Sequence, residues 1–497
     1  MAFGESSGVS RRKFLRGAAT ASAAAIAGRG VYSVLDGFAG PTRVEAATNF
    51  YWEEQYLVPN IEVIGDNGVT VAIPPIYNDV FTAKLSPNLT NKSQLQSAQR
   101  RLESAFKIVE GPYQPSASGL TMVISWGLPY FENYVKTPWQ QYAPVDLAAS
   151  ASGTKTLAVL DAKLGNFPSD PKTVKFEDNH VAIKIRSDSS AIVASVENQL
   201  FIDTTSPAYI GDLLVVTSRR IGFAGRGFGT TSAAKALAVP AGIAGATSIP
   251  DNAQLMMGFT STQTDALGPD NVASFETLRG LTDQYDQRTN TFKYFARGTT
   301  MHLSHLYIDL ASWYGKNYAE RVGRMFSPST PVPTSGQPVT IPNGIPQVAT
   351  RAQVTGEAAN GKAGHNSLLQ QATRFPGRPW PDNYGRMRPK GMAIPVREDF
   401  NTIDDPFAMY LDDYGNRLVP TTNRAGLHFA VFVPTSDRFH RARRAMDGVF
   451  PDDPGFRTRY GLTDDKVGFN SLIQTTHRQN FLVPPRKHRS FPLAELL

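Results

Sequence analysis

The chain is 497 residues long, and its 50 Lys/Arg and 43 Asp/Glu give a formal net charge of +7. The absence of cysteine excludes disulfide bonds and thiolate-bound metals. The length suits one large or two medium domains, and the mild positive charge, without a long Lys/Arg run, gives no indication of nucleic-acid binding.

Residues 1–46 have the pattern of a twin-arginine export signal. Arg11 and Arg12 precede Phe14-Leu15, a short alanine-rich run follows, and Val44-Glu45-Ala46 is a small-x-small cleavage site. The apolar run is too short for a membrane anchor, and no later stretch is apolar enough to cross a membrane. The sequence therefore predicts a protein that passes the twin-arginine translocase and works in the periplasm or outside the cell. The signal holds six Lys/Arg and three Asp/Glu, so its removal leaves 44 against 40, or +4.

The mature chain begins with a predicted surface arm at residues 48–60, which are aromatic and acidic. Apolar and polar residues alternate from 60 to 75 around a Gly-Asp-Asn-Gly turn, which predicts a hairpin. Helical spacing of apolar residues predicts an amphipathic helix over 93–109. The other predicted elements of this half are strands at 81–85, 120–126, 180–186 and 212–219 and a helix at 190–201. Their order, strand-helix-strand-strand-helix-strand, is that of a ferredoxin-like domain.

A similar order recurs in the second half of the chain. The pattern predicts a strand over 291–306, a helix over 307–326, a surface loop rich in Pro, Ser and Thr over 327–345, a strand over 426–433 and a helix over 437–450. Two α+β halves of similar order predict an internally duplicated fold with domains at 47–265 and 266–497.

Several polar motifs have ordinary structural explanations. His302 and His305 are three apart on a predicted strand and would face opposite sides, so a shared metal is disfavoured. Gly225 to Gly229 lacks the ending of a phosphate loop and is predicted to be a turn. The basic helix face around His440 is predicted to be solvated, and the basic tail from His477 to Arg489 is predicted to lie on the surface or to pack on a partner subunit.

The stretch from Gly361 to Gly391 is the main candidate for a site. It is rich in Pro and Gly, and it is predicted to be an ordered loop around a short helical piece. Imidazole is a common axial ligand of haem iron, and arginine can stabilise developing negative charge. The alternative is that the single histidine here is an ordinary surface or hydrogen-bonded residue. The candidate residues are His365, Arg374, Arg378, Arg386 and Arg388.

Seven blocks of the mature chain resemble, in order and spacing, segments of the dye-decolourising peroxidases. These are haem proteins with two ferredoxin-like domains that are often exported by the twin-arginine route. The resemblance implies an α+β fold of two ferredoxin-like domains, with antiparallel sheets and helices packed on them, of the dimeric α/β-barrel type. The blocks are Gly119–Pro129, His180–Leu200, Met257–Thr260, Gly298–Trp313, Lys362–Asn366, Met387–Gly391 and Gly426–Ala430.

The chain departs from the family at its distal motif. Gly258 and Phe259 match the start of the family's Gly-Phe-x-Asp-Gly motif, but Ser261 and Thr262 stand where the aspartate and second glycine are expected. A hydroxyl has no carboxylate form with which to move a peroxide proton. Asp265 lies four residues further on and is the alternative.

The resemblance implies a haem b peroxidase that reduces hydrogen peroxide and oxidises bulky dye-like or phenolic reductants, and it allows a homo-oligomer. His365 would ligate the iron, and Arg388, or Arg386 because Pro389 alters the local pattern, would stabilise the charge of the departing oxygen. Ser261 or Asp265 would hold a water or the peroxide. The alternative, motivated by the replaced motif, is a non-catalytic secreted protein of the same fold that binds haem or is purely structural.

Overall fold

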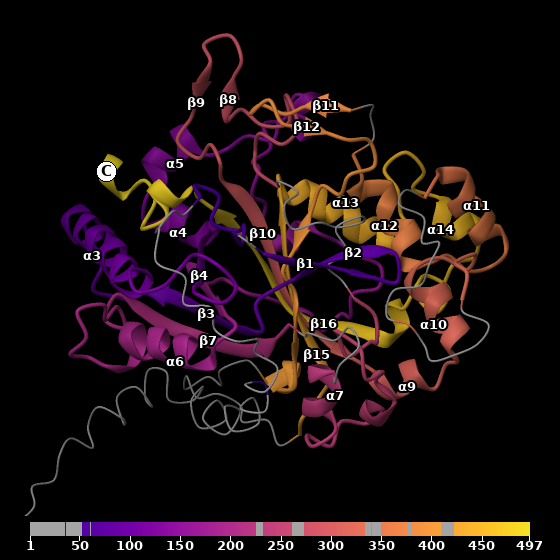
Figure 1. Cartoon of the computed structure of the whole chain (residues 1–497). Helices are drawn as coiled ribbons and strands as arrows, with labels where there is room; N and C mark the ends of the chain where they lie inside the picture. Colours follow the sequence, from indigo (N-terminus) through magenta and orange to yellow (C-terminus); the bar gives the residue numbers. More distant parts are fainter. Residues whose placement is uncertain are drawn as a thin grey trace, which may run out of the picture.

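The computed structural model describes residues 35, 52–59, 61–224, 232–260, 273–332, 339, 349–375, 379–408 and 422–497. Its main sheet has ten strands, and helices cover it on both sides. Figure 1 shows α3, α4 and α6 on one side of the strands and α10 to α14 on the other. Within the described ranges, every helix is too short or too polar to cross a lipid bilayer.

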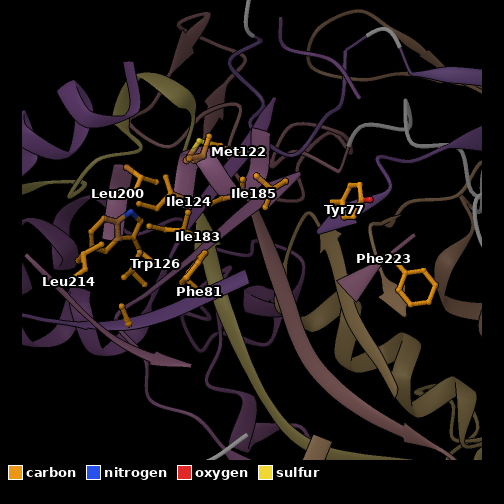
Figure 2. Close-up of a cluster of buried hydrophobic side chains, with 14 of the residues drawn as sticks. Tyr77, Phe81, Met122, Ile124, Trp126, Ile183, Ile185, Leu200, Leu214 and Phe223 are labelled. Atoms are coloured by element: carbon orange, nitrogen blue, oxygen red, sulfur yellow. The ribbon is translucent and has the colours of Figure 1, made fainter. Parts of the chain in front are cut away.

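The amino-terminal half contributes an antiparallel four-stranded unit with the order β7-β3-β6-β4. Alternation along each strand divides its side chains between two faces. Phe81, Trp126 and Ile183 lie on the outer face with Leu200, as Figure 2 shows. The elements are β3 (Tyr77–Leu85), α3 (Lys92–Glu110), β4 (Thr121–Gly127), β6 (Val181–Ser187), α6 (Ser190–Glu197) and β7 (Leu214–Phe223).

Helix α3 illustrates how local sequence fixes an element of this half. Asn91 caps its start by accepting a hydrogen bond from the backbone N–H of Gln94 at 3.0 Å, and the Gln94 side chain accepts one from the Asn91 N–H at 3.2 Å. Leu95, Leu102 and Phe106 are buried on one face of the helix, as their spacing predicts.

The carboxyl-terminal half contributes a second four-stranded unit with the order β14-β15-β10-β16, and β13 extends the β14 edge. The described residues of a long insertion after β10 form the four helices α9 to α12. The elements are β10 (Thr299–Ile308), α9 (Leu310–Tyr314), α10 (Tyr318–Met325), α11 (Arg351–Ala359), α12 (His365–Thr373), β13 (Val396–Arg397), β14 (Phe400–Thr402), β15 (Gly426–Val433), α13 (Ser436–Met446) and β16 (Ile473–Val483).

The two units join into a closed ring of strands. Strand β16 pairs with β4 through Phe481 opposite Gly127 and Leu482 opposite Trp126, and β14 pairs with β7 through Asn401 opposite Phe223. Two ferredoxin-like units closed into one barrel confirm the predicted fold class. The expected domain boundary at 265/266 lies outside the described residues and stays a prediction.

The interior of this barrel combines an apolar core with a buried polar network. Val80, Met301 and Phe432 belong to the apolar part. Beside it, Arg220 contacts the Nε2 atom of His428 at 2.9 Å, and His477 Nδ1 lies 2.7 Å from the Glu177 carboxylate. Burial alone would raise the pKa of Glu177, but Arg220 and His477 lower it to about 2, so this carboxylate is ionised inside the barrel.

The remaining elements lie outside the two four-stranded units. The hairpin predicted over 60–75 is confirmed, with Asn67 and Gly68 at positive φ in its turn. These elements are β1 (Glu62–Asp66), β2 (Val69–Ile73), α4 (Leu128–Asn133), α5 (Lys136–Tyr142), β5 (Lys175–Phe176), α7 (Ala233–Ala238), β8 (Tyr285–Asp286), β9 (Thr291–Phe292), β11 (Trp380–Pro381), β12 (Met387–Arg388) and α14 (Phe456–Arg459).

Four local predictions were wrong. The described part of the expected surface arm, residues 52–59, is mostly buried, and Gln55 bonds the backbone of Ile124 and Pro484. The expected strand over 291–306 is two strands, β9 and β10, and the expected helix over 307–326 breaks at Gly315 into α9 and α10. His440 is buried against Asn480 rather than solvated.

The surface assignment of the basic tail was wrong for His477, Arg478 and Arg489, whereas Lys487 is exposed. His477 and Arg478 lie on β16 inside the structure, and Arg489 is 2% exposed because it pairs with Glu103 and Glu110. Side chains this charged are buried only where ionic partners compensate their loss of hydration, and such partners cannot be seen in a local pattern.

Candidate functional site

A cavity of about 210 Å³ lies between the outer face of the carboxyl-terminal sheet and the helices α12 and α13. Because about 10–15 Å³ is enough to hold one water, this space is far larger than a solvent void. Its walls are mostly aliphatic and aromatic, which suits a flat apolar ligand. The apolar walls include Leu255, Met257, Phe259, Leu306, Ile308, Leu369, Leu427, Phe429, Val431, Phe439, Met446 and Phe469.

Strand alternation decides which residues form the floor of this cavity. On β10, His302, Ser304 and Leu306 face the cavity, whereas His305 faces the barrel interior and contacts Thr402. The expectation that His302 and His305 point to opposite sides is confirmed. The imidazole of His302 already has partners, because its Nδ1 bonds Asn480 at 2.8 Å and its ring stacks on Phe439.

The floor extends across four strands, from Arg397 on β13 through β15 and β10 to Arg478 on β16. Three strand spacings of about 4.8 Å give a width of roughly 14 Å. The cavity is therefore broad along the sheet rather than a narrow tunnel.

His365 is the first residue of α12, and two glycines let the surrounding backbone close on it. A side chain on Gly364 would meet the carbonyl oxygen of Phe326 at 2.2 Å. Gly468 has a φ of +53°, and a Cβ there would lie 2.8 Å from the Cβ of His365. The imidazole also packs on Phe469, with ring centroids 4.2 Å apart. The ring is therefore held in one place against the cavity.

The buried carboxylate of Glu357 anchors the turn that presents His365. It accepts hydrogen bonds from the backbone N–H of Gly364 at 3.0 Å and from the hydroxyls of Ser327 and Ser367 at 2.6 Å each. A carboxylate that accepts bonds at a helix start also satisfies free N–H groups and the helix dipole. Glu357 on α11 thus fixes the start of α12.

The imidazole of His365 is neutral and offers a free nitrogen. Burial, together with the charges of Arg397 and Arg443, lowers the pKa of His365 to about 3. Its Nδ1 atom is buried and has no hydrogen-bond partner among the described residues. Buried polar atoms are normally paired, so an unpaired imidazole nitrogen beside a cavity indicates a ligand-binding role.

A polar strip runs along the sheet edge of the cavity. Arg397, Asp399 and Asn401 alternate on the extended chain of β13 and β14, and all three line the cavity. Glu398, between them, faces the barrel and accepts a hydrogen bond from Lys184. The strip therefore brings a guanidinium and a carboxylate to the same ligand space.

The segment with Gly258 and Phe259 forms one rim of the cavity. Asn401 accepts a bond from the Met256 N–H at 3.0 Å, and the indole of Trp313 donates to the Met257 carbonyl at 2.8 Å. Gly258 has a φ of +86°, so a glycine is required at this turn. The predicted site residues Ser261 and Asp265 lie outside the described residues.

Arg388 and Arg386 do not line this cavity. Arg388 is buried near the β11–β12 hairpin, where it donates to the Asp382 carboxylate at 2.7 Å. Arg386 is half exposed, lies over the ring of Tyr384 and pairs with Glu54 at 3.5 Å. The structure instead brings Arg397 and Arg443 near His365, and Arg443 is already paired with Asp170 and Asp447.

Sequence reasoning missed Arg397 and Asp399 because it stopped at the Gly-rich loop that ends at Gly391. A usable signal begins five residues later, at Val396. Residues 396–402, Val-Arg-Glu-Asp-Phe-Asn-Thr, alternate in the way of a strand and place Arg397, Asp399 and Asn401 on one face.

The residues present fit a haem. His365 supplies one neutral imidazole, the walls are apolar and wide, and Arg397 supplies a cation on the sheet side. The described residues contain no group of three or more His, Asp or Glu side chains able to hold a bare metal ion. A single imidazole beside a broad cavity matches a metal carried by a macrocycle better than one held by protein ligands alone.

Comparison with known proteins gives one family and a set of similar structures. Residues 83–485 match a family described as "Family of unknown function (DUF7405)". Curated proteins give no sequence match. The X-ray generated oxyferrous complex of DtpA from Streptomyces lividans is 15% identical, with 90% of this chain and 96% of that chain covered and a TM-score of 0.51.

A DyP-type peroxidase from Streptomyces coelicolor is also similar. It is 16% identical, with 90% of this chain and 96% of that chain covered and a TM-score of 0.50. At these identities the likeness establishes the fold, which is the one that the sequence resemblance predicts.

Proposed function

The chain belongs to the DUF7405 family and has the fold of the dye-decolourising peroxidases, and from this premise we propose that it is an exported haem-dependent peroxidase. It would reduce hydrogen peroxide and oxidise bulky organic substrates of dye-like or phenolic type. The observation that carries the proposal is the neutral imidazole of His365, which lines a broad apolar cavity with Arg397 on its floor and has a nitrogen without a hydrogen-bond partner in the described part of the chain.

Each residue of the site has a defined role in this proposal. His365 holds the haem iron, and Phe469 and Gly468 keep its ring in place. Bound haem supplies the redox chemistry that protein side chains lack. Arg397 stabilises negative charge that develops as the peroxide bond breaks, a task that suits a guanidinium because it stays protonated. The apolar walls exclude water from the reacting atoms.

The overall reaction balances without any further reagent. One hydrogen peroxide and two organic donors, each of which loses one hydrogen atom, give two waters and two donor radicals. Peroxide is reduced by two electrons, and each donor is oxidised by one. The DtpA structure is named as an oxyferrous complex, which supports haem as the cofactor of a protein with this fold.

Reconstitution with haem tests the proposal. Wild-type protein with added haem should show a Soret band and should oxidise a bulky dye with peroxide. His365→Ala should lose the band. Arg397→Ala should keep the band but react with peroxide on the order of 10²-fold more slowly, since loss of one charge-stabilising donor has an effect of this size. Arg441→Ala, which removes a half-exposed arginine of α13 paired with Asp437, is the matched control and should react like the wild type. Absence of a Soret band in the wild-type protein would refute the proposal.

The second candidate is a non-catalytic haem-binding or structural protein of the same fold. It is favoured by Ser261 and Thr262, which stand where the resemblance implies an aspartate and a glycine. A Soret band without turnover of peroxide and dye would support this candidate over the peroxidase.

We also propose that the protein leaves the cytoplasm by the twin-arginine route, because Arg11 and Arg12 are followed by a short apolar run and a small-x-small site. Replacing both arginines with lysine should retain the full-length protein in the cytoplasmic fraction, and cell fractionation with an antibody measures this. Unchanged export of the double variant would argue for the general secretory route.

A further inference from the structure

We infer that Asp399 is the acid–base residue of the site and takes the task that the resemblance assigns to a loop aspartate; this inference rests on the proposed peroxidase function. The loop position is Ser261, which cannot act as a carboxylate base. A peroxidase of this kind needs a group that carries a proton between the two peroxide oxygens. The described part of the cavity offers few candidates.

Asp399 meets the geometric requirements. It is 7% exposed, lines the cavity and lies two residues after Arg397 on an extended segment, so both side chains are on the same face of the sheet. Its Oδ1 atom is buried without a hydrogen-bond partner among the described residues. A buried carboxylate oxygen without a partner is unfavourable in a structural role, but a substrate hydroxyl would satisfy it.

The other carboxylate that lines the cavity, that of Asp170, is already paired with two arginines. Asp170 pairs with Arg443 at 3.1 Å and with Arg478 at 3.0 Å, so both cations compete for its charge. It also lies toward the opposite edge of the cavity floor, beside β16, whereas Asp399 lies beside Arg397. Asp399 is therefore the available base next to the charge-stabilising arginine.

The proposed step moves one proton and needs no other reagent. The Asp399 carboxylate accepts the proton of one peroxide oxygen and returns it to the other oxygen. That second oxygen then leaves as water when the O–O bond breaks, and Arg397 stabilises the charge that develops on it. The first oxygen becomes the second water when the two organic donors of the proposed reaction supply two electrons and two protons, and Asp399 ends ionised as it began.

Cyanide binding provides a test that does not depend on turnover. Hydrogen cyanide must lose its proton to bind ferric haem as an anion, so a nearby base accelerates its association. Asp399→Asn should bind haem fully but associate with cyanide and react with peroxide on the order of 10²-fold more slowly than the wild type. Asp399→Glu should recover most of both rates. Asp405→Asn, which removes a carboxylate paired with Arg424 away from the cavity, is the matched control and should keep both rates.

The outcomes separate this inference from the proposed function. If wild-type protein binds haem and turns over while Asp399→Asn keeps both rates, the inference is wrong and the peroxidase stands. Loss of both rates in Asp265→Asn instead would assign the role to the loop. If Asp399→Asn binds haem poorly, Asp399→Ser is the second variant. Its cyanide association should be slow, and added acetate should restore that rate because acetate fits the space of the missing carboxylate. A cyanide association rate in Asp399→Ser equal to that of the wild type would overturn the inference. Absence of haem binding in the wild type would overturn both proposals.

Discussion

The position of His365 depends on Gly364 and Gly468, which allow the backbone to close around it. Gly468 has a φ of +53° and approaches the imidazole-bearing residue so closely that any side chain would displace it. Gly461 has a similar φ of +58°, but nothing lies within 4 Å of the position of its Cβ. A side chain at Gly461 would therefore cause backbone strain alone, whereas one at Gly468 would cause the same strain and also displace His365.

We expect Gly468→Ala to weaken haem binding, whereas Gly461→Ala should leave it unchanged. Each substitution forces a left-handed backbone on alanine, which costs about 1–2 kcal/mol of folding stability. Only the first also pushes His365 away from its place on Phe469. Haem titration followed at the Soret band, together with urea unfolding of both variants, measures the two effects. Equal haem affinity in the two variants would show that Gly468 acts only through its backbone.

At the same scale, the sequence could predict His365 but not the arginine that accompanies it. A histidine in a Gly-rich segment, at the place where a resembling family carries its haem ligand, is visible in the chain itself. The choice between Arg386, Arg388 and Arg397 depends on which of these side chains lines the cavity. Arg388 is excluded from the cavity by its bond to the buried Asp382, and this partnership follows from the fold of the hairpin rather than from spacing.

Among the elements, the β11–β12 hairpin is held against the segment that precedes β10 by the buried carboxyl group of Glu276. Glu276 is fully buried and accepts a hydrogen bond from the Tyr384 hydroxyl at 2.6 Å and another from the Arg297 N–H at 3.1 Å. Burial raises the pKa of Glu276 from 4.5 to about 7, although both of these bonds act to lower it. The folded protein therefore keeps a proton on Glu276 that the unfolded chain loses at lower pH.

This difference predicts a pH-dependent stability with a defined sign. The contribution of Glu276 is fully present below about pH 4.5 and is lost as the pH rises through about 7. Its size is at most about 3 kcal/mol, at 1.36 kcal/mol per pKa unit. Glu276→Gln keeps a neutral acceptor, so its stability relative to the wild type should rise between pH 5 and pH 8. Unfolding at several pH values measures this. Glu132→Gln, at an exposed position of α4, is the control; a parallel pH profile of Glu276→Gln and wild type would contradict the prediction.

Most regular elements could be predicted because their apolar residues recur with a helical or strand period. Helix α3 and strand β15 follow their predicted ranges within a residue or so. The failures have physical reasons. The helix expected over 307–326 breaks where Asn317 caps a new helix, and strand β16 was hidden because it carries His477 and Arg478 into the interior, where ionic partners replace water.

For the whole molecule, the carboxyl-terminal segment ties the two halves together. Arg489 reaches across to α3 and pairs with Glu110 at 2.8 Å and Glu103 at 3.1 Å, and its backbone carbonyl accepts a bond from the Trp126 indole. The Arg489 and Glu110 side chains are 2% and 4% exposed. Removal of one partner would leave a charge buried without compensation.

We therefore expect Arg489→Ala to lower the free energy of unfolding by about 3–5 kcal/mol, the usual effect of breaking a buried ion pair. Arg459→Ala removes an exposed arginine that pairs with Asp453, and water replaces that interaction with little loss. Urea unfolding of the two variants makes the comparison. Similar stabilities of the two would mean that the carboxyl terminus contributes little to the joining of the halves.

The duplicated plan of the whole molecule could be predicted from the order of elements, because each half repeats the same strand and helix sequence. The joining of the halves could not. It depends on short pairings, such as Asn401 opposite Phe223 and Leu482 opposite Trp126, between residues far apart in the chain. Long-range pairings of this kind leave no local periodicity.

Closure of the ring has a consequence for how this protein meets others. In the described residues, strands β7 and β4, which would be the outermost strands of the amino-terminal unit, are each paired with a strand of the other unit. These two seams are short, because β14 meets β7 through one residue pair and β16 meets β4 through two. Opening of either seam would therefore break few backbone hydrogen bonds, and it would turn the ring into an open sheet with edges that a foreign strand could extend.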